Sequence, residues 1–307
     1  EMQRSLVGSE MCIRDRYSIE NDILRLTVDS HGAEPVSVIH KPTGAELLWQ
    51  ADPAVWKRHA PILFPYTGKL TGGKMLAKGV EYAGGQHGFA RDVEHTMTHH
   101  ADNLLEFELH ANAETLPKWP YAFVLRSTFT LEGETVHHTL TVENPVEDKL
   151  CFGIGYHPAF ALPFDDRHVT EDYEIRFDGV ESPLCVSAQP NGLLNGQSYY
   201  LARNVEAIQL TDDLFDNDSH AMVNLRSAHV SVIEKDTGRS VICDVSDFPY
   251  TLIWSAPKKP LHFICIEPWH SLPGEENGPT DWEQRPCAAI LKKGESWSTT
   301  LSTTFVR

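Results

Sequence analysis

Three short segments each place an ionisable side chain beside glycine, proline or aromatic residues. They are GGQHGFARD (84–92) with His87, GIGYHPAFALP (153–163) with His157, and FICIEPWHSLPG (263–274) with Glu267. At or near strand ends the backbone turns, so such a side chain can project into a cleft. A carboxylate and imidazoles in one cleft can take up and deliver protons near neutral pH. The first chemistry to consider is therefore general acid–base catalysis.

Glu267 is the most informative of these residues. It ends the apolar run 263–266 and precedes Pro268 and Trp269. A carboxylate buried there is costly unless it is paired or used, which favours a function. A single histidine among sixteen is more often a surface residue or a satisfied core residue, so neither His87 nor His157 marks a site by itself.

Two other motifs carry weaker signals. The segment TGKLTGGKM (67–75) matches part of a phosphate-binding loop, but LAKGVEYAGG follows where that loop requires a helix. Met75 also stands where a serine or threonine would hold magnesium. His95 and His99 have the spacing of a zinc motif, but their segment alternates with period two, which indicates an edge strand with solvated histidines. We therefore expect neither a nucleotide nor a bound metal.

Composition excludes several classes of partner. The 307 residues carry a formal net charge of −17, which disfavours nucleic acid and anionic membrane surfaces. No run approaches the roughly 18 apolar residues of a membrane span, and the N-terminus lacks the apolar segment of a secretory signal. The six cysteines are scattered, and Cys151, Cys243 and Cys265 lie in apolar runs. We expect free, mostly buried thiols and a cytoplasmic protein rather than disulfides or zinc.

The elements that must position these side chains are strands. Segments with alternating or β-branched and aromatic composition include 23–28, 105–111, 121–131, 137–144, 173–177, 229–245, 250–254 and 261–267. Gly, Pro, Asn and Asp separate them, and no long segment has helical periodicity. Antiparallel sheets packed face to face, in one domain from 17 to 307, are the simplest account. Residues 1–16 match no such pattern, and we interpret them as a non-native or disordered segment.

Several segments in a fixed order resemble the aldose 1-epimerase (galactose mutarotase-like) family. They are LLWQADPAVWKRHAPILFPYTGKL (47–70), HGFARD, GYHPAFALP, FPYTLIWS and CIEPW. The resemblance extends over nearly the whole chain from Tyr17 and is greatest for the bacterial branch of lactose-operon X-proteins. It implies an all-β fold, an antiparallel β-supersandwich, in agreement with the strand pattern.

The resemblance also implies an activity and a role for each acid–base residue. The family interconverts the α and β anomers of an aldose without a cofactor. By similarity, Glu267 is the general base on the anomeric hydroxyl, and His157 donates a proton to the ring oxygen. His87 matches a second histidine that hydrogen-bonds the sugar near these atoms.

Sugar-binding residues are implied in the same way. Lys69 lies where many members carry an arginine that contacts sugar hydroxyls. Asp218 is the candidate for the family's sugar-binding aspartate, with Asp213 or Asp216 as alternatives because the local spacing departs from the family pattern. Apolar faces for the sugar are expected from five further residues, which are Trp49, Trp56, Phe89, Tyr156 and Trp269.

Two alternatives remain open at this point. A cationic group of Lys57, Arg58, Lys69 and Lys74 would suit an epimerase of hexose 6-phosphates. A lysine at position 69 cannot form the bidentate fork of an arginine, which leaves room for a non-catalytic sugar-binding or sugar-sensing protein. The expected partner is a small sugar, and the protein is expected to be a monomer or a homodimer.

Overall fold

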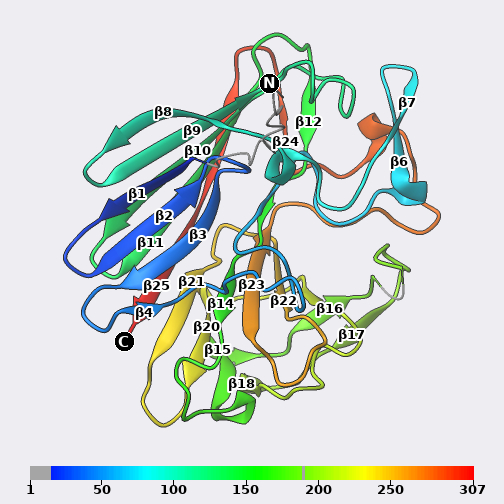
Figure 1. Cartoon of the computed structure of the whole chain (residues 1–307). Coiled ribbons are helices and arrows are strands. Elements are labelled where there is room, and N and C mark those ends of the chain that lie inside the picture. Colours follow the sequence, from blue (N-terminus) through cyan, green and yellow to red (C-terminus); the bar gives the residue numbers. More distant parts are fainter. Residues whose placement is uncertain (1–14, 189–190) are drawn as a thin grey trace, which may run out of the picture.

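A computed structural model describes residues 15–188 and 191–307 and is built almost entirely of β-strands (Figure 1). Its largest sheet has nine strands in the order β18-β15-β20-β21-β25-β11-β10-β9-β8. Their bounds are β8 (Thr96–Ala101), β9 (Leu104–His110), β10 (Val124–Glu132), β11 (Thr135–Glu143), β15 (Tyr173–Glu181), β18 (Val205–Gln209), β20 (His229–Glu234), β21 (Ser240–Asp244) and β25 (Ser296–Val306). The neighbouring strands of this sheet are antiparallel, as the sequence predicts.

A second sheet of eight strands has the order β17-β16-β19-β22-β23-β13-β5, with β14 also paired to β23. Its members are β5 (Ile62–Leu63), β13 (Gly155–Tyr156), β14 (Ala159–Ala161), β16 (Leu184–Val186), β17 (Ser198–Tyr200), β19 (His220–Met222), β22 (Tyr250–Trp254) and β23 (Phe263–Trp269). The predicted all-β class and antiparallel sheets are therefore confirmed.

Three smaller sheets complete the fold. They comprise β1 (Arg16–Glu20), β2 (Leu24–Asp29), β3 (Glu34–His40) and β4 (Ala45–Glu46); β6 (Lys74–Ala77) with β7 (Val80–Ala83); and β12 (Leu150–Phe152) with β24 (Ala289–Leu291). The described helices are four single 3₁₀ turns, η1 (Thr71–Gly73), η2 (Ala90–Asp92), η3 (Thr170–Asp172) and η4 (Trp282–Gln284). None of the helices in the described ranges has the length and apolar character needed to span a bilayer.

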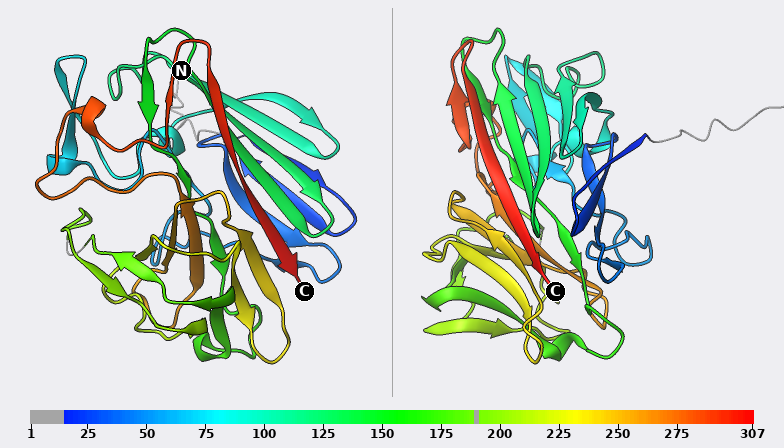
Figure 2. Two further views of the ribbon diagram at one scale, coloured as in Figure 1. Left: turned by 180° about the vertical axis from the view of Figure 1, so that it is seen from behind. Right: turned by 90° about the vertical axis from the view of Figure 1, so that its left-hand side faces the viewer.

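The β1–β4 sheet lies beside the long strands of the nine-stranded sheet (Figure 2). Every second residue of β10 and β11 is buried, which is the alternation of strands with one face on a core. Leu26 of β2 shares that core with Phe107 of β9 and Leu125 of β10. Burial of each such side chain contributes about 1.5–3 kcal/mol, so the packed faces hold these two sheets together.

Strand β23 is buried on both faces and lies inside the second sheet. Ile264 and Ile266 belong to the main core, whereas Phe263 and Cys265 belong to a separate cluster with several tryptophans. Because successive side chains alternate between the faces of a strand, Glu267 lies on the same face as Cys265. This face of β23 is where the candidate site lies.

Three expectations need correction at this level. First, β1 begins at Arg16, and the carbonyl of Asp15 accepts a hydrogen bond from Ser30 N at 2.9 Å. Those two residues belong to the fold and not to the excluded segment, whereas residues 1–14 lie outside the described ranges.

Second, Cys151 and Cys287 form a disulfide, with 5.7 Å between their Cα atoms. The pairing of β12 with β24 brings the two segments together, and Ala288 N donates to the carbonyl of Phe152 at 2.8 Å. The expectation of free thiols was wrong for this pair. In the described part of the chain Cys185, Cys243 and Cys265 are free and buried, as expected.

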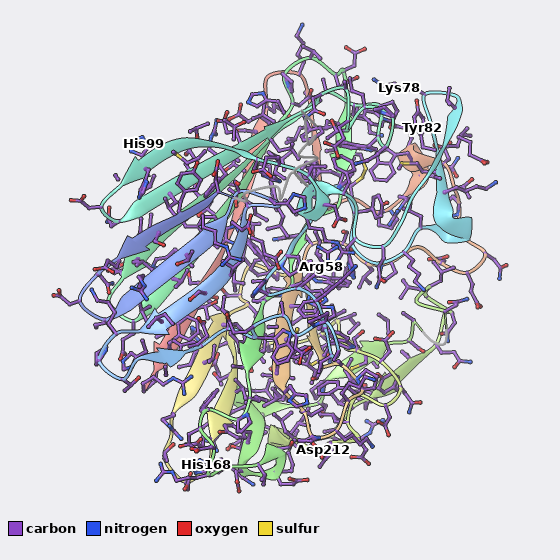
Figure 3. All side chains as sticks on the ribbon, viewed as in Figure 1. Arg58, Lys78, Tyr82, His99, His168 and Asp212 are labelled. Atoms are coloured by element: carbon purple, nitrogen blue, oxygen red, sulfur yellow. A yellow bond between two sulfur atoms is a disulfide. The ribbon has the colours of Figure 1, made fainter. Side chains whose placement is uncertain are left out.

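Third, His95 is buried, and its Nε2 donates to the carbonyl of Ala90 at 2.9 Å. The expectation of a solvated side chain was wrong, because His95 precedes β8 and its ring is hydrogen-bonded to Ala90 of η2. His99 is exposed on the edge strand β8, as expected (Figure 3). Residues 67–75 form a turn, η1 and the start of β6, which is not the strand–loop–helix of a nucleotide site.

Candidate functional site

A cavity of about 530 Å³ opens over the face of β23 that carries Glu267. Its size falls within the roughly 300–1,000 Å³ of small-molecule sites. In addition to the predicted Trp56, Lys57 and Arg58, the structure brings five predicted residues to its wall from four other parts of the chain. They are His87, His157, Asp218, Glu267 and Trp269.

The register of β23 places His157 opposite Glu267. Strands β13 and β14 both pair with β23, with Gly155 opposite Trp269 and Ala159 opposite Cys265. In the same register, His157, which is midway between Gly155 and Ala159, lies opposite Glu267. Both side chains are buried, and Nε2 of His157 lies 3.2 Å from Oε2 of Glu267. A broken strand pairing thus creates a direct contact between an imidazole and a carboxyl group.

Burial controls the protonation of this pair. Loss of solvent raises the pKa of Glu267 well above its ordinary value, and the nearby charge of Asp218 adds to that rise. Burial also lowers the pKa of His157 to about 3, with a further contribution from the positive charge of Arg91. In the favoured state, the Glu267 carboxyl group is protonated and the His157 imidazole is uncharged. The pair then holds one proton that can be transferred between the two groups.

His87 is fixed by two hydrogen bonds to the same residue. Its backbone N–H donates to the carbonyl of Gly68 at 2.8 Å, and the Gly68 N–H donates to Nδ1 of the His87 ring at 3.0 Å. Burial and then the charge of Arg91 lower the pKa of His87 well below its ordinary value. The ring is therefore neutral with its proton on Nε2, so it can donate a hydrogen bond in the cavity.

The backbone around His87 is strained to achieve this position. His87 itself has φ +68°, a region that residues other than glycine rarely adopt. The next residue, Gly88, has φ +70°, and a Cβ atom there would lie 2.0 Å from the carbonyl oxygen of Phe64. Gly88 therefore permits a close approach of two backbones.

Tryptophans contribute flat apolar faces to the cavity wall. The Trp56 ring stacks on the His157 ring with 5.0 Å between centroids and 23° between planes, and Trp254 meets His157 edge-on at 5.6 Å. Trp269 lies edge-on to His87 at 5.4 Å, and its Nε1 donates to the carbonyl of Tyr156 at 3.2 Å. Flat apolar faces beside polar groups suit the C–H surface of a sugar ring.

Arg91 is a cavity residue that the sequence reasoning missed. Its Nη2 donates to the carbonyl of Gln86 at 2.7 Å, and burial followed by the charge of Arg58 lowers its pKa to about 10. Arg58, which is labelled in Figure 3, also lines the cavity and pairs with Asp92 at 2.6 Å. The available signal was the position of Arg91 inside HGFARD, four residues after His87.

Four predicted sugar-binding residues do not line the cavity in the described structure. One of them, Tyr156, is buried, and its hydroxyl donates to the carbonyl of His138 at 2.8 Å. Lys69 is exposed, and its Nζ donates to the carbonyl of Asn191 at 2.7 Å. Trp49 donates from Nε1 to the carbonyl of Trp56 at 2.7 Å, so it supports a cavity residue from behind. Phe89 is buried in the main core against Phe123.

Among the three candidate aspartates, only Asp218 reaches the cavity in the described residues. It has φ +81°, and its Oδ1 accepts a hydrogen bond from Ser219 N at 2.8 Å. Asp213 accepts instead from the Thr211 hydroxyl at 2.6 Å, and Asp216 pairs with Lys259 at 3.0 Å.

Comparisons with known proteins identify the family of this chain. The family model described as aldose 1-epimerase matches residues 15–304. The plasmid-encoded protein LacX of Lactococcus lactis subsp. lactis is 33% identical over 262 residues, which cover 83% of this chain and 87% of that protein.

Two solved structures have similar folds and similar sequences. A galactose mutarotase related enzyme from Lactobacillus acidophilus superimposes with a TM-score of 0.90 at 31% identity, covering 95% of this chain and 98% of that one. A galactose mutarotase-like protein from Lactobacillus casei gives 0.87 at 31% identity, covering 95% and 100%. The chain belongs to the aldose 1-epimerase family.

Proposed function

We propose that this protein is an aldose 1-epimerase that interconverts the α and β anomers of a hexose by acid–base ring opening and closure. The observation that carries the proposal is the 3.2 Å contact between His157 and Glu267 on the wall of a cavity with aromatic faces. Mutarotation needs one proton removed from O1 while another is added to the ring oxygen O5. A pair that holds one proton supplies both an acceptor and a donor.

The roles implied by the family require the proton to pass from Glu267 to His157 when sugar binds. The Glu267 carboxylate then removes the O1 proton, the C1–O5 bond breaks, and the imidazolium of His157 protonates O5. After rotation about C1–C2, His157 takes the proton back from O5, which attacks the other face of C1. Glu267 returns its proton to O1, and both groups regain their starting states. No step needs a metal or a redox cofactor.

The other cavity residues support this chemistry. A neutral His87 with its proton on Nε2 is suited to hydrogen-bond a sugar oxygen near the reacting atoms. Asp218, which also lines the cavity, can accept hydrogen bonds from sugar hydroxyls. The tryptophan faces and these polar groups together match the composition of a site for a small sugar.

The test is the rate of anomer exchange of freshly dissolved hexoses, followed by polarimetry or NMR. Glu267→Gln keeps the shape of the side chain but removes the carboxylate, and it should reduce the enzymatic rate by about 10²–10⁴-fold. Glu81→Gln is the matched control, because Glu81 is exposed on β7 and pairs with Lys74. Equal rates for wild type and Glu267→Gln would sink the proposal.

A second candidate is an epimerase of hexose 6-phosphates. It is favoured by three cations on the cavity wall, which are Lys57, Arg58 and Arg91. Guanidinium groups bind phosphate oxygens well, and a buried one does so with little competition from water. A much higher kcat/KM for glucose 6-phosphate than for glucose, abolished in Arg91→Gln, would select this candidate. Tight sugar binding by calorimetry without catalysed exchange would instead select a sugar-binding protein.

We further propose a cytoplasmic setting, which the buried free thiols Cys185, Cys243 and Cys265 support. The disulfide between Cys151 and Cys287 is the observation against it, because disulfides are rare in a reducing cytoplasm. Alkylation and mass spectrometry of protein taken directly from cells will show whether this pair is oxidised there.

A further inference from the structure

We propose that His157, Cys265 and Glu267 form a binding site for a zinc ion, and that the bound ion blocks the site. One ligand atom from each of these residues lies within 4.8 Å of the other two. The predicted effect on activity rests on the proposed function, whereas binding of the ion does not.

The backbone brings the three ligands together. Cys265 and Glu267 are two residues apart on β23, so their side chains project from the same face of the strand. Ala159 pairs with Cys265 across the ladder, and His157 lies two residues before it, opposite Glu267. The three positions are therefore fixed by strand pairing, which limits the movement needed to close around an ion.

The distances and the donor types fit zinc. Tetrahedral zinc with bonds of about 2.0–2.3 Å to nitrogen, oxygen and sulfur sets its ligand atoms about 3.3–3.6 Å apart. The existing distance between His157 Nε2 and Glu267 Oε2 is 3.2 Å. A set with a thiolate, an imidazole and a carboxylate favours zinc over magnesium or calcium, which prefer oxygen donors.

Access and charge are also suitable. His157 and Glu267 line the cavity, so an ion can arrive from solvent and keep its fourth position toward the cavity. Cys265 lies behind them and is fully buried. Binding displaces the protons of the thiol and the carboxyl group to solvent, and the two anionic ligands then neutralise the ion.

The consequence for the proposed reaction is direct. A bound zinc ion uses the lone pair of His157 Nε2 and an oxygen of Glu267, which are the atoms that would exchange protons with the sugar. Zinc should therefore inhibit anomer exchange, and added hexose should compete with it.

A second group of similar composition shows why the first one stands out. Asp165, His168 and Glu234 also have ligand atoms within 4.8 Å of one another. Arg239 already occupies that group, with Nη2 2.6 Å from Asp165 Oδ2 and 2.6 Å from Glu234 Oε2. A guanidinium there repels a divalent ion. In the described residues no lysine or arginine forms an ion pair with His157, Cys265 or Glu267, and Arg91 acts on His157 and Glu267 only at longer range from the cavity wall.

The experiment titrates Co²⁺, a spectroscopic substitute for zinc, into the full-length protein after treatment with a chelator. A thiolate bound to cobalt gives a charge-transfer absorption in the near ultraviolet. We expect one equivalent of cobalt to produce this band, one equivalent of zinc to remove it, and Cys265→Ser to lack it. Cys243→Ser is the matched control, because Cys243 is an equally buried free thiol that is not among the residues lining the cavity, and it should keep the band.

Wild-type protein that gives no such band overturns the site even if the Cys265 variants do not fold. A band that persists in folded Cys265→Ser or Cys265→Ala overturns it as well. In the rate assay, the rate of each variant with zinc is compared with its own rate without metal. Loss of Cys265 should raise the zinc concentration needed for inhibition by more than the about 10–100-fold typical of a lost outer-shell contact. A cobalt band in a protein without anomer exchange would refute the proposed function and leave the metal site intact.

Discussion

The N–H group of Gly68 donates a hydrogen bond to Nδ1 of His87 at 3.0 Å. This single contact decides what His87 can do, because a ring nitrogen that accepts a hydrogen bond cannot carry the proton. The remaining proton must be on Nε2, and burial keeps the ring from gaining another. The main chain of one loop therefore selects the tautomer of a residue in another loop.

His87→Ala should reduce kcat by about 10²–10³-fold, the usual cost of a preorganised hydrogen-bond donor. His87→Gln can restore a donor near the position of Nε2 and should recover part of the loss. Long-range ¹H–¹⁵N NMR of the wild type should show a neutral ring with unprotonated Nδ1 at pH 5. A doubly protonated ring at that pH, or full activity in His87→Ala, would contradict the assigned role.

The rate of the enzymatic reaction should be nearly independent of pH from about pH 4.5 up to the raised pKa of Glu267. The reason is that burial lowers the pKa of His157 to about 3 and raises that of Glu267 well above its ordinary value. The pair keeps one proton throughout this range. A solvated carboxyl group and a solvated imidazole, with ordinary pKa values of 4.5 and 6.5, would instead change the rate near those pH values.

The measurement is kcat/KM over this pH range, with the spontaneous exchange subtracted at each pH. A steep change centred near pH 6.5 would show that His157 titrates as a solvated histidine. In that case the neutral, single-proton state of the pair is wrong, although the residues could still be catalytic.

Acid should destabilise the fold partly through His138. The ring stacks on Phe129 at 4.0 Å between centroids, its Nε2 lies 2.7 Å from Ser127 Oγ, and burial lowers its pKa to about 3. In the unfolded chain the pKa of His138 is near 6.5, so between about pH 3 and pH 6.5 the unfolded chain binds more protons than the folded protein. The free energy of unfolding therefore falls as the pH drops through this range. From pH 7 to pH 5 the contribution of His138 to the free energy of unfolding should fall by about 2 kcal/mol.

Urea unfolding of wild type and His138→Gln at both pH values tests this. The variant is less stable at pH 7, but it should lose about 2 kcal/mol less than wild type on acidification. The other buried histidines are present in both proteins, so their effects cancel in the difference. Equal losses would mean that His138 is protonated inside the folded protein.

The fold class could be predicted from sequence because alternation and turn residues are local signals. The alternation over residues 105–111 and 121–131 became β9 and β10, and Gly238 has the positive φ expected of a hairpin turn. The disulfide could not be predicted, because 136 residues separate Cys151 from Cys287 and only the pairing of β12 with β24 joins them.

The site divides in the same way. His87, His157 and Glu267 were visible because each lies in a short motif beside residues that turn the chain. The contact between His157 and Glu267 was not visible, because it depends on the register of two interrupted strands against β23. The side-chain direction of Lys69, away from the cavity, could not be predicted from sequence either. It follows from φ +63° at Gly68 and from the close approach of Gly68 to Pro273.

Lys69 should act on sugar affinity through the cavity wall and not through the sugar. Its Nζ holds the carbonyl of Asn191 at 2.7 Å, and its side chain lies so close to Gly192 that a Cβ there would be 3.1 Å from it. Gly192 and Leu194 line the cavity, and Leu194 N donates to the carbonyl of Gly274 at 2.9 Å. The lysine therefore fixes one end of the 191–194 wall segment.

Lys69→Ala should raise KM severalfold with little change in kcat, because the wall loosens while the acid–base pair stays in place. Gly192→Ala should change KM in the same direction, since its new methyl group presses on the Lys69 side chain. Lys74→Ala is the control, because Lys74 pairs with Glu81 at the surface and touches neither segment. If Lys69→Ala lowers kcat strongly while Gly192→Ala has no effect, Lys69 contacts the reacting sugar directly, and the positioning role is wrong.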